Sequence, residues 1–287
     1  MKNIMITGAA RGIGFALVKR AIARGDQVFA MVRKQSDEAK FSSHNHLHVI
    51  EMDVASSTSV EQGFVEVDRL LAGKQLNAVI NAAAISQPGA IELTPVSDFD
   101  QALNTNALGS LRVMKASIPR LRGHGGRAIM ITSLWGQASS AMLTAYCMSK
   151  HAVESLVDCA RRETDGMGMH VIVIEPGVIQ TDMYKDQGPH VQALIDAMSP
   201  EQKLRYEPLY TRYLNLVGGA AGAGVEGAGI SVEQCAIDIE QALFDPEPKP
   251  RYQSGEDARK MIALARQLSD IEMDAVLRER LNFLPLQ

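Results

Sequence analysis

The sequence predicts a single α/β domain over residues 1–287, with a doubly wound, largely parallel seven-stranded sheet and helices on both faces. Three observations predict this class. Short apolar runs of strand type alternate along the chain with longer stretches of helical period. A glycine-rich turn joins the first predicted strand to the first predicted helix. Polar residues suited to chemistry follow the ends of predicted strands, where open α/β sheets place their ligands.

The composition is that of an ordinary globular protein. Hydrophobic residues make up 46% and charged residues 22% of the 287 positions, with a net charge of −4. This charge argues against nucleic-acid binding, which favours a strongly basic face. No apolar run approaches the ~18 residues of a membrane helix, and no signal-peptide pattern opens the chain. The three cysteines have neither disulfide nor metal spacing. We therefore expect a soluble cytoplasmic protein without a membrane span or a metal site.

The first predicted strand, residues 3–7, runs into a turn of the form Gly-x-x-x-Gly-x-Gly. We expect Gly8 to permit the tight turn, Gly12 to let the backbone approach a diphosphate, and Gly14 to allow close helix–strand packing. The helix that follows offers free N–H groups to an anion at its N-terminus. A glycine turn without a ligand is the alternative, because the general dinucleotide pattern is Gly-x-Gly-x-x-Gly.

The end of the second predicted strand, residues 27–32, favours NADP(H) as the cofactor. An NAD site usually places a carboxylate here to bind the ribose hydroxyls. Val32 takes that place and is followed by Arg33 and Lys34, while Arg11 lies within the glycine turn. Cations without a carboxylate suit a 2′-phosphate. The alternative is that Arg33 and Lys34 only solvate a loop, and NAD(H) is the alternative cofactor.

Other strand ends offer candidates for holding the rest of a dinucleotide. Asp53 follows a predicted strand and can accept the adenine amino group, with Val54 behind the ring; capping a helix is its rival role, for which Ser56 lies nearer. The fourth predicted strand leads into small residues that let the backbone approach the cofactor. After the sixth, the backbone of Ile179 and the hydroxyl of Thr181 are placed to meet a carboxamide.

A candidate acid/base group lies between Ser133 and Lys150. If the chain is helical there, Tyr146 and Lys150 are one turn apart on one face. A free phenol has a pKa of about 10, and a nearby ammonium lowers that pKa, so the pair can exchange a proton at working pH. Ser133, at the end of the fifth strand, can hold the reacting oxygen. The alternative is that tyrosine and lysine four residues apart are only helix neighbours.

Asn106 lies in a helical stretch, residues 96–121, where asparagine is unfavourable by propensity. The sequence therefore indicates a kink or a bound water near this residue. A simple exposed asparagine is the alternative.

In this order, the motifs closely resemble the short-chain dehydrogenase/reductase family over roughly residues 1–185. The matching elements are Thr7-Gly8-x-x-x-Gly12-x-Gly14, Asp53-Val54, Asn106-x-x-Gly109, Ser133, Tyr146-x-x-x-Lys150 and Pro176-Gly177-x-x-x-Thr181. The resemblance implies a Rossmann-type fold and an enzyme that interconverts a ketone and a secondary alcohol. It further implies that Tyr146 is the general acid/base and that Ser133 positions the reacting oxygen. Lys150 would bind the nicotinamide ribose and lower the pKa of Tyr146, and Asn106 would hold a water in a proton relay.

The complete set of cofactor-binding candidates is Thr7, Gly8, Arg11, Gly12, Ile13, Gly14, Arg33, Asp53, Val54, Asn81, Ala82, Ala83, Tyr146, Lys150, Pro176, Gly177, Ile179 and Thr181. One element departs from the family pattern. The usual Asn-Asn-Ala-Gly is here Asn81-Ala-Ala-Ala84, so Ala82 lacks an amide that normally ties adjacent strands. We expect an effect on local stability but not on the chemistry.

Residues 183–230 are expected to form a substrate-binding lid with helices at 189–198 and 200–217. The substrate-contact candidates are Ser133, Trp135, Met142, Tyr146, Met183 and Tyr210, although the apolar members can instead be packing residues. The glycine-rich stretch 218–229 can hinge a closing lid or serve as a passive linker.

The C-terminal extension, residues 251–287, is predicted to hold a short strand and two amphipathic helices. Its Pro-Arg-Tyr segment, which ends at Tyr252, resembles the hydroxysteroid and retinol dehydrogenase branch of the family. That resemblance implies a lipophilic small-molecule substrate such as a steroid-like alcohol, and a homodimer or homotetramer. The alternatives are a reductase of small polar or acyl-thioester ketones, and an NADP-binding regulatory protein with little turnover.

Overall fold

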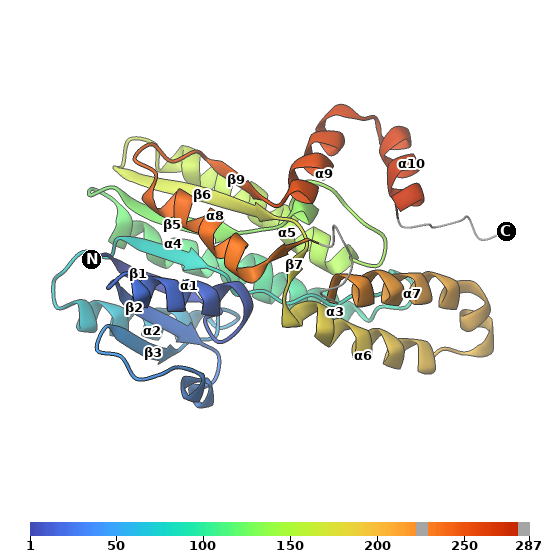
Figure 1. The fold of residues 1–287 in the computed structure, drawn as a ribbon, viewed down its shortest axis with the longest axis horizontal. Coiled ribbons are helices and arrows are strands. Elements are labelled where there is room, and N and C mark those ends of the chain that lie inside the picture. Colours follow the sequence, from blue (N-terminus) through green and yellow to red (C-terminus); the bar gives the residue numbers. More distant parts are fainter. Residues whose placement is uncertain (222–228, 281–287) are drawn as a thin grey trace.

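Seven strands form one sheet in the order β3-β2-β1-β4-β5-β6-β9 (Figure 1) in the computed structural model, which describes residues 1–221 and 229–280. Every neighbouring pair is parallel, and the strand order turns back between β1 and β4, which opens a crevice at their carboxyl ends. The predicted fold class is therefore confirmed. The strands are β1 Asn3–Thr7, β2 Gln27–Val32, β3 Leu47–Glu51, β4 Ala78–Asn81, β5 Gly126–Ile131, β6 Met169–Pro176 and β9 Arg251–Ser254.

Successive side chains of each strand point to opposite faces of the sheet, so each face carries an apolar layer. Ile4 and Ile6 of β1 belong to one buried cluster, whereas Met5 belongs to the cluster on the other face. Helices α1 and α8 cover the first layer, and α2, α4 and α5 cover the second. Their bounds are α1 Gly12–Ala23, α2 Ser57–Leu71, α4 Gly109–Leu121, α5 Thr144–Glu163 and α8 Val232–Phe244.

The helical stretch predicted at residues 96–121 is interrupted at its asparagines. It consists of α3 Val96–Ala102, a π-helical turn η2 Leu103–Leu108, and α4. Asn106 lies in the π-helical turn and is buried. Such turns are rare and occur often at functional sites, so the irregularity that the asparagines predicted is present.

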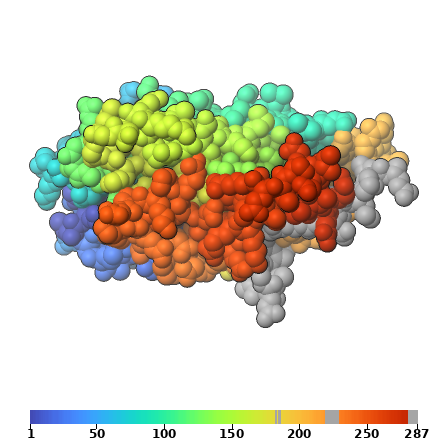
Figure 2. Space-filling model, turned by 90° about the horizontal axis from the view of Figure 1, so that it is seen from above, coloured from blue at the N-terminus to red at the C-terminus, as the bar shows by residue number. Residues whose placement is uncertain are grey.

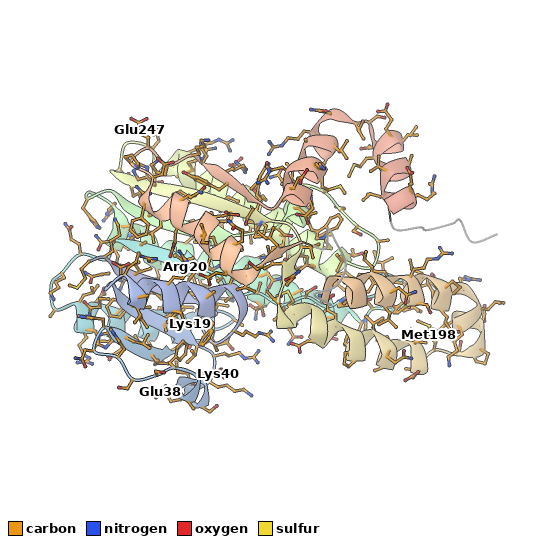
Figure 3. The ribbon with its side chains drawn as sticks, viewed as in Figure 1. Lys19, Arg20, Glu38, Lys40, Met198 and Glu247 are labelled. Carbon is orange, nitrogen blue, oxygen red and sulfur yellow. The ribbon has the colours of Figure 1, made fainter. Side chains whose placement is uncertain are left out.

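A helical hairpin projects from the carboxyl edge of the sheet (Figure 1) and consists of α6 Asp182–Asp196 and α7 Pro200–Ala221. Met198, labelled in Figure 3, lies in the connection between the two helices. The prediction that the first helix begins at Pro189 is wrong. Thr181 has the extended backbone of an N-cap residue, so α6 begins directly after it and carries Pro189 in its interior.

The glycine-rich stretch 218–229 is only partly described. Its first residues, through Ala221, continue α7, and the remainder of the predicted hinge, residues 222–228, lies outside the described residues. The structure also contains an unpredicted pair of short parallel strands, β7 Ile179–Gln180 and β8 Ile230–Ser231. This pair joins the loop after β6 to the start of α8.

The C-terminal extension packs beside the loop that follows β5. Helix α9 Glu256–Gln267 buries Met261 and Ile262 in a cluster with Leu134, and α10 Asp270–Arg280 follows it. Figure 2 shows these helices, in red, lying along the surface of the molecule. Two short helical turns complete the elements, η1 Gln35–Lys40 and η3 Leu134–Gly136. None of the helices in the described ranges is long and apolar enough to cross a membrane.

Candidate active site

A cavity of about 630 Å³ lies at the carboxyl edge of the sheet, between the glycine turn, the start of α5 and the α6–α7 hairpin. Most of the residues predicted for the site line this cavity. They are Gly8, Arg11, Gly12, Ile13, Gly14, Arg33, Asp53, Val54, Ala82, Ala83, Ser133, Trp135, Tyr146, Lys150, Pro176, Gly177, Ile179, Thr181 and Met183. The predicted residues that do not line it are Thr7, Asn81, Asn106, Met142 and Tyr210.

Two glycines of the turn, Gly8 and Gly14, leave no room for a side chain. Gly8 has φ +63°, and a Cβ atom there would lie 2.9 Å from the Ala83 backbone. A Cβ on Gly14 would lie 2.4 Å from the Gly8 carbonyl oxygen, so α1 can approach β1 only with glycine at this position. Thr181 faces the turn from the opposite side, 3.6 Å from the place of a Gly12 Cβ. The first residues of α1, Gly12, Ile13 and Gly14, line the cavity.

Thr7 and Asn81 lie behind the cavity and tie β1 to β4. The Thr7 hydroxyl donates to Asn81 Oδ1 at 2.6 Å and accepts from the N–H groups of Ala82 and Ala83, each at 3.1 Å. Asn81 Nδ2 donates in turn to Ser110 Oγ at 2.9 Å. The backbone N–H groups of Ala82 and Ala83 thus also join the end of β4 to β1.

Cations gather where the cavity meets the ends of β2 and η1. Arg33, Lys34 and Lys40 line this part together with Asp37, and Figure 3 shows Lys40 on η1 at the edge of the molecule. Sequence reasoning missed Lys40, which the η1 turn brings back toward the strand end. Arg11, on the other side, pairs with Asp186 of α6 at 2.8 Å, and both side chains are more than half exposed.

Ser133, Tyr146 and Lys150 face the same cavity from the end of β5 and the first two turns of α5. Ser133 is buried, and its Oγ accepts the Trp135 N–H at 3.2 Å. Lys150 Nζ donates to the Ile131 carbonyl at 3.0 Å and lies 5.6 Å from the centroid of the Tyr146 ring. Burial lowers the pKa of Lys150 to about 8, and the carboxylate of Glu154 opposes this shift. The arrangement brings a hydroxyl, a phenol and an ammonium to one wall.

Asn106 fixes the loop after β4 to α5. Its Nδ2 donates to the Ile85 carbonyl and to Ser149 Oγ, each at 2.9 Å, and its Oδ1 accepts the Ile85 N–H at 2.9 Å. The side chain therefore supports the cavity wall from behind, and its predicted contact with a relay water stays a prediction.

Two of the predicted substrate contacts, Met142 and Tyr210, do not line the cavity, and their side chains pack in the apolar cluster of the α6–α7 hairpin. Met142 is 2% exposed, and Tyr210 is fully buried with its hydroxyl accepting the Ala90 N–H at 2.9 Å. Gln187 and Tyr213, which sequence reasoning missed, line the cavity instead, and the Tyr213 hydroxyl donates to Gln187 Oε1 at 2.7 Å. Had the sequence analysis started this helix at Asp182, Gln187 would have been found, because it lies four residues after Met183 on the same helix face.

The family model for short chain dehydrogenases matches residues 2–192. This chain belongs to the short-chain dehydrogenase family. It is therefore an oxidoreductase that acts on CH–OH groups, as its motifs predicted.

Three curated relatives show how far the similarity of this short-chain dehydrogenase extends. The 3-amino-tetrahydro-pyrrolizinone reductase of Xenorhabdus hominickii is 30% identical over 95% of this chain and 93% of its own length. The NADPH-dependent 3-dehydrocapnine reductase of Ornithobacterium rhinotracheale is 30% identical over 64% of this chain and 68% of its own. Retinol dehydrogenase 16 of Mus musculus is 29% identical over 96% of this chain and 87% of its own length. The cofactor named for the second relative agrees with the NADP(H) prediction.

Proposed function

We propose that this short-chain dehydrogenase uses NADP(H) to interconvert a lipophilic ketone and its secondary alcohol. The observation that carries the proposal is that Ser133, Tyr146 and Lys150 open onto a cavity that also contains the glycine turn. The wall with Tyr146 can thus transfer a proton and bind an alcohol oxygen, while the neighbouring wall, formed by the glycine turn, fits a dinucleotide.

The residues around the cavity fit a bound NADP(H). Backbone N–H groups at the start of α1 offer a partial positive charge to a diphosphate, and the space that a Cβ on Gly8 would need is already filled. Arg33 and Lys34 at the end of β2 suit a 2′-phosphate. Asp53 and Val54 also line the cavity, where they can contact the adenine. When bound, the cofactor supplies or accepts the hydride.

The proton is handled by the chain's own side chains. In the reducing direction the Tyr146 phenol donates its proton to the substrate oxygen, and the Ser133 hydroxyl holds that oxygen by a hydrogen bond. The Lys150 ammonium favours the phenolate that results, since an opposite charge nearby stabilises a charged group. Asn106 keeps the wall behind these residues in place through Ile85 and Ser149.

A lipophilic substrate suits the part of the cavity under the α6–α7 hairpin. Trp135, Leu143 and Met183 give it apolar walls, and Gln187 held by Tyr213 adds a polar group that can meet a second substrate oxygen. We assign residues 183–221, the described first part of the predicted lid segment 183–230, to a cover over this space. Retinol dehydrogenase 16 is named for a lipophilic alcohol and is similar to this chain over most of its length.

The experiment is a panel of ketones offered to the purified protein with NADPH, with steroid ketones and acyl-thioester ketones as the two arms. We expect NADPH consumption with the lipophilic arm, and a loss of about 10²–10⁴-fold in kcat for Tyr146→Phe. NADPH binding by the variant, followed by fluorescence, should stay within a few fold of the unsubstituted protein. Turnover of the acyl-thioester arm alone would reject the substrate class. Near-normal turnover by Tyr146→Phe would reject the mechanism.

We also propose a homodimer or homotetramer built on α4 and α5. Met148 of α5 and Leu111 of α4 are 48% and 37% exposed, which is high for large apolar side chains on helices that otherwise cover the sheet. A symmetric contact through these helices would cover both of them.

A further inference from the structure

Glu154 is a buried carboxylate directly behind the proposed catalytic group. It lies on α5 one turn beyond Lys150 and two turns beyond Tyr146, so the three side chains share a helix face. Only 6% of Glu154 is exposed. A buried charge is costly unless partners satisfy it, so the contacts of this carboxylate show what it does in the fold.

Its contacts reach the loop that carries Ser133 from both sides. Oε1 accepts the Thr132 hydroxyl at 2.5 Å, and Oε2 accepts Gln137 Nε2 at 3.0 Å. Thr132 precedes Ser133 directly, and Gln137 ends the short η3 turn after it. Gly136 also packs here, because a Cβ at that position would lie 3.0 Å from Glu154 Cγ. The carboxylate therefore joins the helix of Tyr146 and Lys150 to the loop of Ser133.

Arg251 of β9 completes the shell around this carboxylate. Its Nη2 donates to Glu154 Oε2 at 3.0 Å, its Nη1 pairs with Asp158 at 2.9 Å, and its Nε lies 3.3 Å from the fully buried Glu175 of β6. Burial, together with the charge of Glu154, raises the pKa of Glu175. The outer charges are Arg161 and Arg162, which both pair with Asp158, and Arg266 of α9, which contacts Gln137.

This arrangement places one negative charge where it acts on Lys150. Burial lowers the pKa of Lys150 to about 8, and Glu154 is the group whose charge raises it. Arg251 and Arg266 lie on the side of Glu154 that faces β9 and α9. Removing the Glu154 charge would leave these cations in place and would make the ammonium of Lys150 easier to deprotonate.

We propose, building on the function proposed above, that Glu154 is a positioning residue for this reaction. It holds the Ser133 loop against α5, and its negative charge favours the ammonium form of Lys150.

The experiment compares the pH dependence of kcat for NADPH-driven ketone reduction in the unsubstituted protein and in Glu154→Gln. Glutamine keeps the size and one acceptor for Thr132 but removes the charge. We expect the high-pH loss of activity to move to lower pH by roughly one unit. The KM for NADPH should change less than about threefold, since Glu154 does not line the cavity. Glu163→Gln, an exposed carboxylate at the end of α5, is the control and should leave the profile unchanged.

The holding role is tested separately by Thr132→Val, which removes the hydroxyl that bonds Glu154 and the Ile174 carbonyl but removes no charge. We expect a lower kcat with the high-pH limb in its original place, and this variant also serves if Glu154→Gln does not fold. The inference would be overturned if the high-pH loss of activity occurred at the same pH in Glu154→Gln as in the unsubstituted protein. It would also be overturned if the activity of the unsubstituted protein did not fall up to pH 10, or if Thr132→Val had an unchanged kcat. Absence of any ketone reduction by the unsubstituted protein would instead reject the proposed function itself.

Discussion

Arg33 is the residue whose charge we expect to decide between NADP(H) and NAD(H). It is exposed at the end of β2 and lines the cavity beside Lys34. In Arg33→Asp, a charge-assisted contact with the 2′-phosphate is lost and a repulsive charge is added, so NADPH affinity should fall by at least about tenfold. NADH affinity should change far less, because NADH lacks that phosphate.

Fluorescence titration with both nucleotides measures this change. Lys74→Asp, the same change of charge at an exposed position in the turn after α2, is the matched control and should bind NADPH normally. Equal losses of NADPH and NADH affinity in Arg33→Asp would show that Arg33 does not bind the 2′-phosphate.

The sequence predicted single residues well where a local pattern carried the information. Tyr146 and Lys150 share a helix face by spacing alone, and Ser133 ends a strand, so all three were found and all three line the cavity. The sequence did not separate Met142 and Tyr210, which do not line the cavity, from residues that do, because an apolar side chain has the same appearance in sequence whether it packs in a core or faces a cavity. Their burial in the hairpin cluster depends on contacts with distant residues.

At the scale of elements, the approach of α1 to β1 depends on Gly14. A methyl group there would lie 2.4 Å from the Gly8 carbonyl oxygen, so Gly14→Ala must displace the turn. We expect a loss of about 1–3 kcal/mol in the free energy of unfolding, the usual cost of overpacking, together with weaker NADPH binding.

Urea unfolding with and without NADPH measures both effects. Gly188→Ala is the control, because Gly188 lies within α6 with nothing within 4 Å of its added Cβ. Alanine there should stabilise the helix by up to about 1 kcal/mol. Equal stability and equal NADPH affinity in Gly14→Ala and the unsubstituted protein would contradict the proposed role of the glycine turn.

Elements with a clear period or cap were predictable, and short or interrupted ones were not. Ser231 caps α8 by accepting the Gln234 N–H, and its Ser-x-x-Gln spacing is that of a capping box. The asparagines around residue 106 indicated an irregular helix, but nothing local specified a π-helical turn. Pro189 suggested a helix start because proline favours the first turn, yet Thr181 is where the backbone enters α6. Strands of two residues, such as β7, have no periodicity to detect.

For the whole molecule, we expect assembly through α4 and α5. The unsubstituted chain of 31.1 kDa should therefore elute as a dimer or tetramer in size-exclusion chromatography with light scattering. Met148→Glu, which places a charge on the exposed apolar part of α5, should shift the population to smaller species. Met167→Glu, at a similarly exposed methionine in the loop before β6, is the control and should leave the mass unchanged. A monomeric unsubstituted protein would contradict this assembly.

The layered arrangement of the whole molecule was predictable because alternating strand and helix patterns allow few packings. The order of the strands follows from chain connections that the sequence does not display, and so does the seating of β9 beside β6. That seating matters for the site, since it brings Arg251 to Glu154 across nearly one hundred positions of sequence. The C-terminal extension therefore reaches the buried charges behind the cavity.

Transfer of a deuterium label tests the central claim most directly. The purified protein is given NADPH that carries deuterium at both C4 positions, together with a ketone that it reduces, and the alcohol is examined by mass spectrometry and NMR. The account predicts one deuterium on the carbinol carbon, with the hydroxyl proton drawn from solvent through Tyr146. An alcohol whose carbinol hydrogen comes from water would contradict it.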